Sequence, residues 1–426
     1  MARSIAVDVS ELWRRVGITL GALVIYRLGA HIPLPGVELS VLQEIFERNG
    51  ARGLDIFTGG AASRMSILAL GLAPYISASI TLLLVHAVWQ KLLRRPVDAY
   101  GLDHYARIGA VVLAATQALA IAVGLETVGV PLVSDPGPVF ELSTVVVLTA
   151  GSVFTMWLAD EITRRGIGNG VGLIFFSGIV ARLPSAIVDV LDIYHGGARS
   201  PAVIALFLLL FVAVVALIVF MESAERRLLV QYRPRIVGTM MFEGEGAHLT
   251  LRPNGFGIIP VLFASSWLLF PVTLASSTAE PAGWTVALAA YLRHGSPGYM
   301  AYYAGLILFF AFLYIALLIS PRAVAGALAG HGGTIDGQAP GEATARYLAS
   351  VRNRLTLLGA VYVAAVCLLP EFLVARYNTP FYFGGSTLLV VVCVALDLVR
   401  QLRAHLGVSR RGRASRPPPI DPGPAS

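Results

Sequence analysis

Residues 57–80 read FTGGAASRMSILALGLAPYISASI, and this stretch decides how the chain meets a membrane. It begins with a glycine pair, passes Arg64 and then becomes apolar, yet the apolar part keeps Pro74, Ser77 and Ser79. A simple membrane anchor needs no proline or serine, because its backbone bonds are made within the helix and its surface faces lipid. The stretch therefore indicates either a helix that lines a more polar path or a kinked structural helix with small packing residues.

The composition is that of a protein that crosses a bilayer many times. Of the 426 residues, 56% are hydrophobic and only 13% are charged. Cys367 and Cys393 fall inside apolar segments, so the sequence has no disulfide framework and no CxxC metal motif. Ten apolar segments each approach the length of about 17–25 residues that a spanning helix needs. They are 16–33, 66–88, 107–129, 141–160, 169–188, 201–221, 255–276, 300–320, 355–373 and 384–400.

The distribution of arginine and lysine predicts the orientation of these segments. With a cytoplasmic N-terminus, the cytoplasmic pieces hold 24 basic residues and the opposite loops hold 7. Basic residues accumulate in cytoplasmic loops because positive charge resists translocation. The sequence therefore predicts a multi-pass membrane protein with both termini in the cytoplasm.

The spans lack the residues that several other functions need. Ionisable residues within them, Arg27, Asp160 and Asp397, sit near span ends, whereas ion-coupled transporters place such groups at mid-depth. The sequence has no HExxH and no GxSxG motif. The run GIGNGVG at 166–172 follows no strand, so it favours close helix packing or a bent helix start over dinucleotide binding. We expect no enzyme activity, no cofactor and no metal.

Two long loops, 222–254 and 321–354, lie on the predicted cytoplasmic side. In the first loop, residues 228–232 and 247–251 are short mixed runs that can pair as a hairpin, with Gly244 and Gly246 near the turn. Loops of this length are usually functional. They indicate a docking platform, although solvated connectors remain the alternative. The tail 406–426 is rich in proline and arginine and is expected to be disordered.

Several stretches together resemble the SecY family, the central channel subunits of the bacterial Sec protein translocase. They are FTGGAASRMSILALGLAPYISASI, MWLADEITRRGIGNGVGLIFFSGIVARLP, IIPVLFASSWLLFP, SPRAVAGALAGHGG, PGEATARYLASVRNRLTLLGAVY, CLLPEF and PFYFGGSTLL, in the family's order over roughly residues 10–405. The resemblance implies an all-α polytopic fold of ten transmembrane helices in two pseudo-symmetric five-helix halves, 1–200 and 201–405. It also implies a protein-conducting channel in the bacterial inner membrane that passes unfolded secretory chains and releases membrane helices sideways into lipid.

The resemblance gives the opening stretch two roles. In the family a short half-helix, the plug, precedes the second full span and closes the outer funnel. Here it is expected at 54–64, with Leu54, Phe57, Gly59, Gly60, Ser63 and Arg64. Segment 66–88 is then one wall of a lateral gate, in which Pro74 weakens the helix ladder. The expected gate residues are Pro74, Ser77, Ser79, Ser265 and Ser266.

The resemblance also places an apolar pore ring at the centre of the channel. Apolar constrictions hold back ions by dewetting, so such a ring suits a pore that passes unfolded chains. Two pairs, 72/76 and 171/175, have the i,i+4 spacing that stacks side chains on one helix face. The family prefers isoleucine in this ring, and Phe175 departs from that preference. The expected ring residues are Leu72, Ile76, Val171, Phe175, Leu262 and Val390.

The implied partners are the SecE and SecG subunits, the SecA motor, the ribosome, YidC, signal peptides with their nascent chains, and membrane lipid. The signal peptide is expected to enter between the second and seventh spans. The expected docking residues are Arg226, Arg227, Arg233, Arg235, Gly341 and Glu342.

Two departures from the family pattern fall on this docking face. The family has an arginine pair where this chain has Thr239 and Met240, and an arginine where it has Ala339. The loop between the second and third spans is also shortened. These departures favour an alternative, a specialised or accessory SecY paralogue with altered coupling. A small-solute transporter is a further alternative, for which Gln117 and Asn169 are the only well-placed amides within the spans, and helix–helix hydrogen bonding explains each of them better.

Overall fold

The structure is a computed structural model of the full chain. It describes residues 9–38, 40–41, 60–93, 100–127, 132–184, 188, 201–232, 235–237, 240–242, 247–276, 291, 296–335, 337–377 and 385–405.

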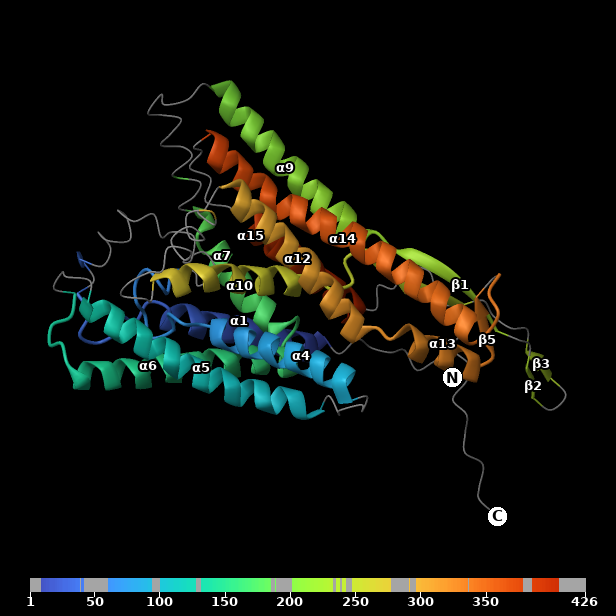
Figure 1. The fold of residues 1–426 in the computed structure, drawn as a ribbon, viewed down its shortest axis with the longest axis horizontal. Coiled ribbons are helices and arrows are strands. Elements are labelled where there is room, and N and C mark those ends of the chain that lie inside the picture. The colour runs from blue at the N-terminus through green and yellow to red at the C-terminus, as the bar shows by residue number, and fades with distance from the viewer. Residues whose placement is uncertain are drawn as a thin grey trace, which may run out of the picture.

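Each of the ten apolar segments overlaps a helix, as the sequence predicts (Figure 1). In the N-terminal half these are α1 (Val9–Gly29), α4 (Ala73–Leu93), α5 (Tyr100–Thr127), α6 (Pro138–Arg165) and α7 (Gly170–Val180). In the C-terminal half they are α9 (Pro201–Ser223), α10 (Ile259–Ser276), α12 (Pro297–Leu318), α14 (Glu342–Tyr377) and α15 (Gly385–His405). Among the described residues, five helices are long and apolar enough to cross a membrane, and three shorter ones are apolar.

A stripe of small residues lets α5 pack closely between its neighbours α4 and α6. Alanines recur every fourth residue along one face of α5, and all of them are buried. Lipid tails are as apolar as the helix surface, so helices in a membrane associate by close packing. Small side chains allow their backbones to approach each other. An ion pair between Arg107 and Asp160 at 2.8 Å joins the first part of α5 to the last part of α6. The stripe consists of Ala106, Ala110, Ala114, Ala118 and Ala122.

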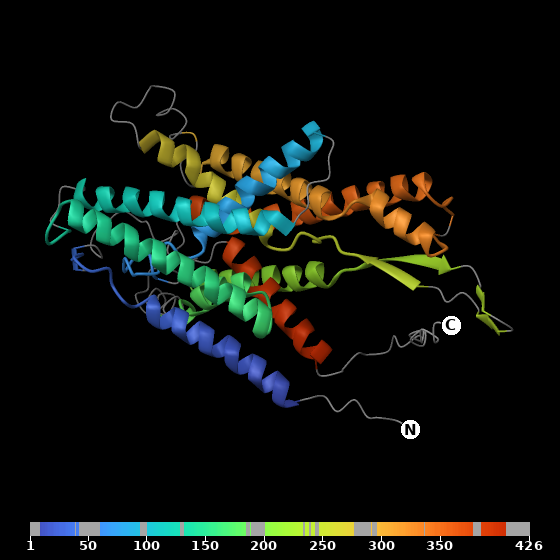
Figure 2. The same cartoon turned by 90° about the horizontal axis from the view of Figure 1, so that it is seen from below.

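One large apolar cluster joins the two halves of the molecule. It takes residues from α1, α4, α6 and α7 on one side and from α9, α10, α12, α14 and α15 on the other. Helix α4 contacts α10, and α7 contacts α15, so the halves meet along two seams. Figure 2 shows α4 crossing the helices of the C-terminal half, in the view from below.

The second span begins later than the sequence predicts. Residues 60–72 form turns, and α4 starts at Ala73 instead of 66, because Gly71 has a φ of +51° that ends the turns. Pro74 lies in the first turn of α4, where its missing N–H would be unpaired in any case. The expectation that Pro74 weakens the helix ladder is therefore wrong.

The segment 60–72 is fixed by backbone contacts on two sides. The N–H of Leu34 donates to the carbonyl of Met65 at 2.8 Å, and the N–H of Ile67 donates to Ile32 at 3.0 Å. On the other side, a Cβ at Gly151 of α6 would come within 1.9 Å of the Ile67 carbonyl oxygen. Only glycine permits this contact. An apolar segment of this kind is buried by protein rather than by lipid.

The first long loop forms the predicted strand pair, but a second pair at 235–242 lies between its strands, and Gly244 and Gly246 of the predicted turn lie outside the described residues. β1 (Arg226–Tyr232) pairs antiparallel with β4 (Ala247–Leu251), with Leu228 opposite Leu249. The second loop adds β5 (Gly333–Ile335) to the free edge of β1, which gives the order β4-β1-β5. Two further short strands, β2 (Arg235–Val237) and β3 (Met240–Phe242), pair with each other.

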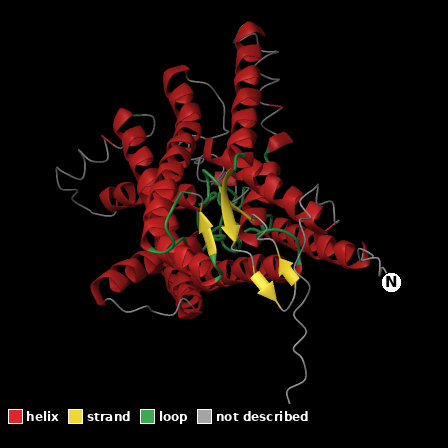
Figure 3. Cartoon of the chain, turned by 90° about the vertical axis from the view of Figure 1, so that its right-hand side faces the viewer, coloured by secondary structure: helices red, strands yellow, loops and turns green. Residues whose placement is uncertain are grey.

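The sheet β4-β1-β5 has a small core of its own. Its inward side chains pack on α13 (Pro321–Gly330) and on the start of α14. The strands lie beyond the helices, at the end of the molecule where α1 begins and α15 ends (Figures 1 and 2). Figure 3 looks onto this end and shows the strands among the helix ends. The buried residues of this core are Leu228, Val230, Ala325, Ile335, Ala345 and Leu348.

Candidate pore collar, gate and docking sheet

All six predicted ring residues belong to the large apolar cluster or pack against it. Five are buried within the large apolar cluster, and Val171 packs against that cluster from a partly buried position. Leu72 is the last residue of the turns before α4, Ile76 lies in the first turn of α4, and Val390 comes from α15 with no exposed surface. Residues that are 318 apart in the sequence (72 to 390) are therefore buried in the same apolar cluster. We call this group the collar: Leu72, Ile76, Val171, Phe175, Leu262 and Val390.

The described part of the predicted plug, residues 60–64, precedes the first collar residue, Leu72, in the sequence. Leu54, Phe57 and Gly59 lie outside the described residues. Gly60 is buried with a φ of +93°, which favours glycine, and its carbonyl accepts hydrogen bonds from the N–H of Arg64 and the Ser63 hydroxyl, each at 3.3 Å. Residues 60–64 therefore form a turn, which is the described part of the predicted plug. A Cβ at Gly60 would lie within 4 Å of Arg64 and Arg182.

Two of the predicted gate serines, Ser79 and Ser265, make hydroxyl hydrogen bonds within the protein. Ser79 donates to the carbonyl of Tyr75 at 2.8 Å within α4. Ser77 is half-buried, and its carbonyl accepts a hydrogen bond from Thr81. Ser265 of α10 lies 3.2 Å from the Tyr303 hydroxyl of α12, while Ser266 lies next to it in α10. These hydrogen bonds leave the contact between α4 and α10 itself to apolar packing, which separates more readily than a polar network does.

The glycine run at 166–172 forms a tight turn that joins four helices. A Cβ at Gly166 would come within 2.4 Å of the Thr19 hydroxyl, and one at Gly170 within 1.9 Å of the Ala159 carbonyl. The prediction that these glycines allow close helix packing is confirmed. Asn169 caps α7 by accepting from the N–H of Gly172, so this amide serves as a helix cap.

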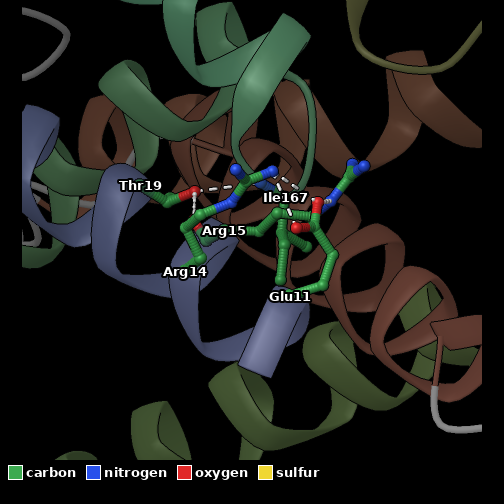
Figure 4. Close-up of polar contacts among 5 residues, drawn as sticks. All are labelled: Glu11, Arg14, Arg15, Thr19 and Ile167. Carbon is green, nitrogen blue, oxygen red and sulfur yellow. Dashed lines mark hydrogen bonds and ion pairs between the residues drawn. The ribbon is translucent and has the colours of Figure 1, made fainter. Parts of the chain in front are cut away.

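Side chains from both halves hold this turn in place. Thr19 of α1 accepts a hydrogen bond from the N–H of Ile167 at 2.9 Å and donates to the Arg15 carbonyl at 3.0 Å (Figure 4). From α15, Gln401 accepts a hydrogen bond from the N–H of Gly168 at 2.8 Å. The turn is thus a bridge between α1 and α15. Sequence reasoning missed both contacts, since hydroxyls and amides near helix ends carry no signal of their distant partners.

Charged residues at the start of α1 support the same region. Glu11 accepts hydrogen bonds from Arg15 and Arg14, both at 2.9 Å (Figure 4). These two guanidinium groups, Arg15 first, lower the pKa of Glu11 from its ordinary value. An acidic residue in the first turn also complements the positive end of the helix. The pairs are exposed, so they orient the first turn more than they stabilise it.

The predicted docking residues fall on the sheet and the loop beside it. Arg226 and Arg227 are exposed on β1, and Arg235 lies in β2, while Arg233 and Thr239 lie outside the described residues. Glu342 begins α14 and lies 3.6 Å from Arg322 of α13. Gly341, with a φ of +95°, makes the turn before it. Ala339 is exposed on the same loop, and its carbonyl accepts a hydrogen bond from Thr344.

These features define a class of protein. It is a polytopic helical membrane protein whose two halves meet around a buried apolar collar, with a small sheet at one end of the bundle.

Comparison with known proteins narrows this class. The family model for SecY matches residues 66–399. The chain is 41% identical to the protein translocase subunit SecY of Vibrio cholerae over 416 residues, which cover 95% of this chain and 94% of that one. It is also 41% identical to the protein of the same name from Escherichia coli K12, over 93% and 92% of the two chains. The chain belongs to the SecY family.

Solved structures show the same fold at lower identity. A structure titled as a protein conducting channel matches with a TM-score of 0.64 and 16% identity, over 93% of this chain and 94% of that one. Sec61 in the canine ribosome–channel complex matches with a TM-score of 0.62 and 16% identity over the same shares. The predicted fold, an all-α polytopic SecY fold in two helical halves, is confirmed.

Proposed function

We propose that this protein is the protein-conducting channel of a bacterial Sec translocase in the inner membrane. It passes unfolded secretory chains across the bilayer and releases membrane helices sideways between α4 and α10. The observation that carries the proposal is that both halves of a SecY-family chain supply apolar side chains, the collar residues among them, to one buried cluster. A closed apolar constriction blocks ions, and a chain that parts the halves opens it. No covalent step is needed, since partners supply the energy.

The proposed orientation places both termini and the docking sheet in the cytoplasm. Two independent observations support it. Basic residues are concentrated on this side, 24 against 7. The start of α1 and the end of α15 also lie at the same end of the molecule as the sheet. The proposed partners are SecE and SecG within the complex, and SecA, the ribosome and YidC on or beside it, with the segment before α4 as the plug.

Reconstitution tests the proposal directly. The protein, purified with its SecE and SecG partners, is placed in liposomes with SecA, ATP and a radiolabelled secretory precursor. We expect the precursor to become resistant to external protease, and a precursor without its signal sequence to remain sensitive. Precursor that stays fully sensitive in intact, correctly oriented proteoliposomes would contradict SecA-driven export by this chain.

One observation favours a second candidate, a specialised paralogue with altered coupling. Exposed Ala339 stands on the docking loop where the family has arginine, and the tip of the first loop carries apolar Met240. Ala339→Arg separates the two candidates. Export that barely changes fits a chain whose docking is already intact. A large gain in SecA-dependent export supports the specialised docking face.

A further inference from the structure

A buried carboxylate lies outside the collar, where α9 meets the first cytoplasmic loop. Glu222 is 8% exposed, and Asn254, just before α10, is 6% exposed. The Asn254 amide donates a hydrogen bond to the Glu222 carboxylate. From α15, Arg400 donates to the backbone carbonyl of Glu222 at 2.5 Å. A buried, hydrogen-bonded carboxylate is costly to leave unpaired, so this contact is hard to break.

The contact between Glu222 and Asn254 is the first of three successive contacts between the segment that joins α9 to β1 and the segment that follows β4. Above it, Arg252 pairs with Glu225 at 3.0 Å. Above that, Arg226 lies opposite Leu251 as the first pair of β1 and β4. The two segments that leave the sheet therefore contact each other as far as the end of α9 on one side and the turn before α10 on the other. Residues 224–225 connect α9 to β1, and turns at 253–258 connect this contact to the start of α10 at Ile259.

Helix α14 packs against the other side of the contact between Glu222 and Asn254. A Cβ at Gly359 would come within 2.2 Å of the Pro253 carbonyl oxygen, so the α14 backbone lies directly against the chain before Asn254. The Tyr362 hydroxyl lies one turn further along α14 and is buried beside the Glu222 carboxylate. The segment before α10 is thus held between α14 and the end of α9. Close-packed interiors transmit strain, so we expect a displacement of the sheet to be passed on through this packed contact.

We propose that Glu222 and Asn254 form the joint through which a partner docked on the sheet β4-β1-β5 moves α10 relative to α4. The inference rests on the proposed function, because it concerns the gate of a protein-conducting channel. Both residues are positioning residues, since neither reaches the collar or the translocating chain. The sheet receives the partner, the joint transmits its displacement, and the apolar α4–α10 contact is the seam that yields.

The test measures the gate distance with the joint intact and broken. Spin labels on unnatural amino acids at Thr81 of α4 and Trp267 of α10 report the separation across the seam in the full complex in nanodiscs. Ribosomes that display a signal sequence are the added partner. Glu222→Met with Asn254→Leu removes both polar groups at similar volume, which protects the fold. Glu222→Gln keeps an acceptor of the same shape. Asp160→Asn breaks an ion pair in the other half and is the matched control.

We expect ribosomes to lengthen the distance in the wild type, in Glu222→Gln and in Asp160→Asn. In the double variant the ribosome-induced change is lost, while ribosome affinity and melting temperature stay close to wild type. A double variant that keeps the full change overturns the joint and leaves the channel function standing. Loss of ribosome binding together with the change also overturns it, because the contact would then only shape the docking sheet. A wild type that binds ribosomes without any change contradicts the proposed gating itself.

Discussion

Thr19 links the first helix to a turn that lies 148 residues further along the chain. Its hydroxyl is the acceptor for the buried N–H of Ile167. A buried N–H that loses its partner costs about 1–3 kcal/mol. A single side-chain oxygen therefore fixes the position of α1 against the start of α7.

Replacing this hydroxyl should destabilise the protein without changing side-chain volume. We expect Thr19→Val to lower the free energy of unfolding by about 1–3 kcal/mol, since the N–H of Ile167 then stays buried and unpaired. Thermal unfolding of the detergent-solubilised complex measures the loss. Thr116→Val is the control, because Thr116 is exposed on α5 and bonds only within its own helix turn. Equal melting temperatures for the two variants would show that the Thr19 contact carries no stability.

Gly151 makes a second prediction at the residue scale. Gly151→Ala places a methyl group against the Ile67 carbonyl, and overpacking of this kind costs about 1–3 kcal/mol. We expect a lower melting temperature and a displaced segment 60–72. Gly21→Ala in α1, where no atom lies within 4 Å of the added carbon, should be neutral or stabilising. Limited proteolysis and thermal unfolding of both variants compare the two sites, and a stable Gly151→Ala protein would refute the close contact.

At the scale of elements, the sequence predicted what depends on local pattern. Hydropathy located every helix that carries the collar, and alternating runs located the pairing of β1 with β4. The start of α4 was misplaced, because hydropathy cannot tell a segment buried by protein from one buried by lipid. The addition of β5 to β1 and the contact of Gln401 with Gly168 were also missed, since both join residues far apart in sequence.

The position of Ile76 within α4 allows a test of the collar as an element. We expect Ile76→Asn to make the resting channel leak ions, because a polar side chain in the collar favours its hydration. Ile80→Asn is the matched control, since Ile80 is the same residue type, is buried in α4 and lies one turn beyond the collar. Conductance of planar bilayers or proteoliposomes gives the comparison. Equal leakage from both variants would indicate general loosening of the helix packing and not a constriction at Ile76.

At the scale of the whole molecule, the two halves share one apolar cluster and meet at two seams, α4–α10 and α7–α15. A hydrogen bond from the N–H of Gly168 to Gln401 crosses the α7–α15 seam, whereas α4 and α10 both contribute apolar side chains to the cluster. The halves can therefore separate at α4 and α10 while they stay joined near α7 and α15. The sequence alone implied these halves only through a family resemblance, because apolar residues facing each other across a seam look like any other buried residues.

The central claim is that an unfolded polypeptide passes through the collar. Photocrosslinking probes at Leu72, Ile76 and Val390 in the reconstituted complex, with an arrested secretory chain, test it most directly. A probe at Ala118, buried in α5 away from the collar, is the control. We predict crosslinks to the arrested chain from all three collar positions and none from Ala118. An intact complex that binds the arrested chain but gives no collar crosslinks would contradict a polypeptide pore at this site.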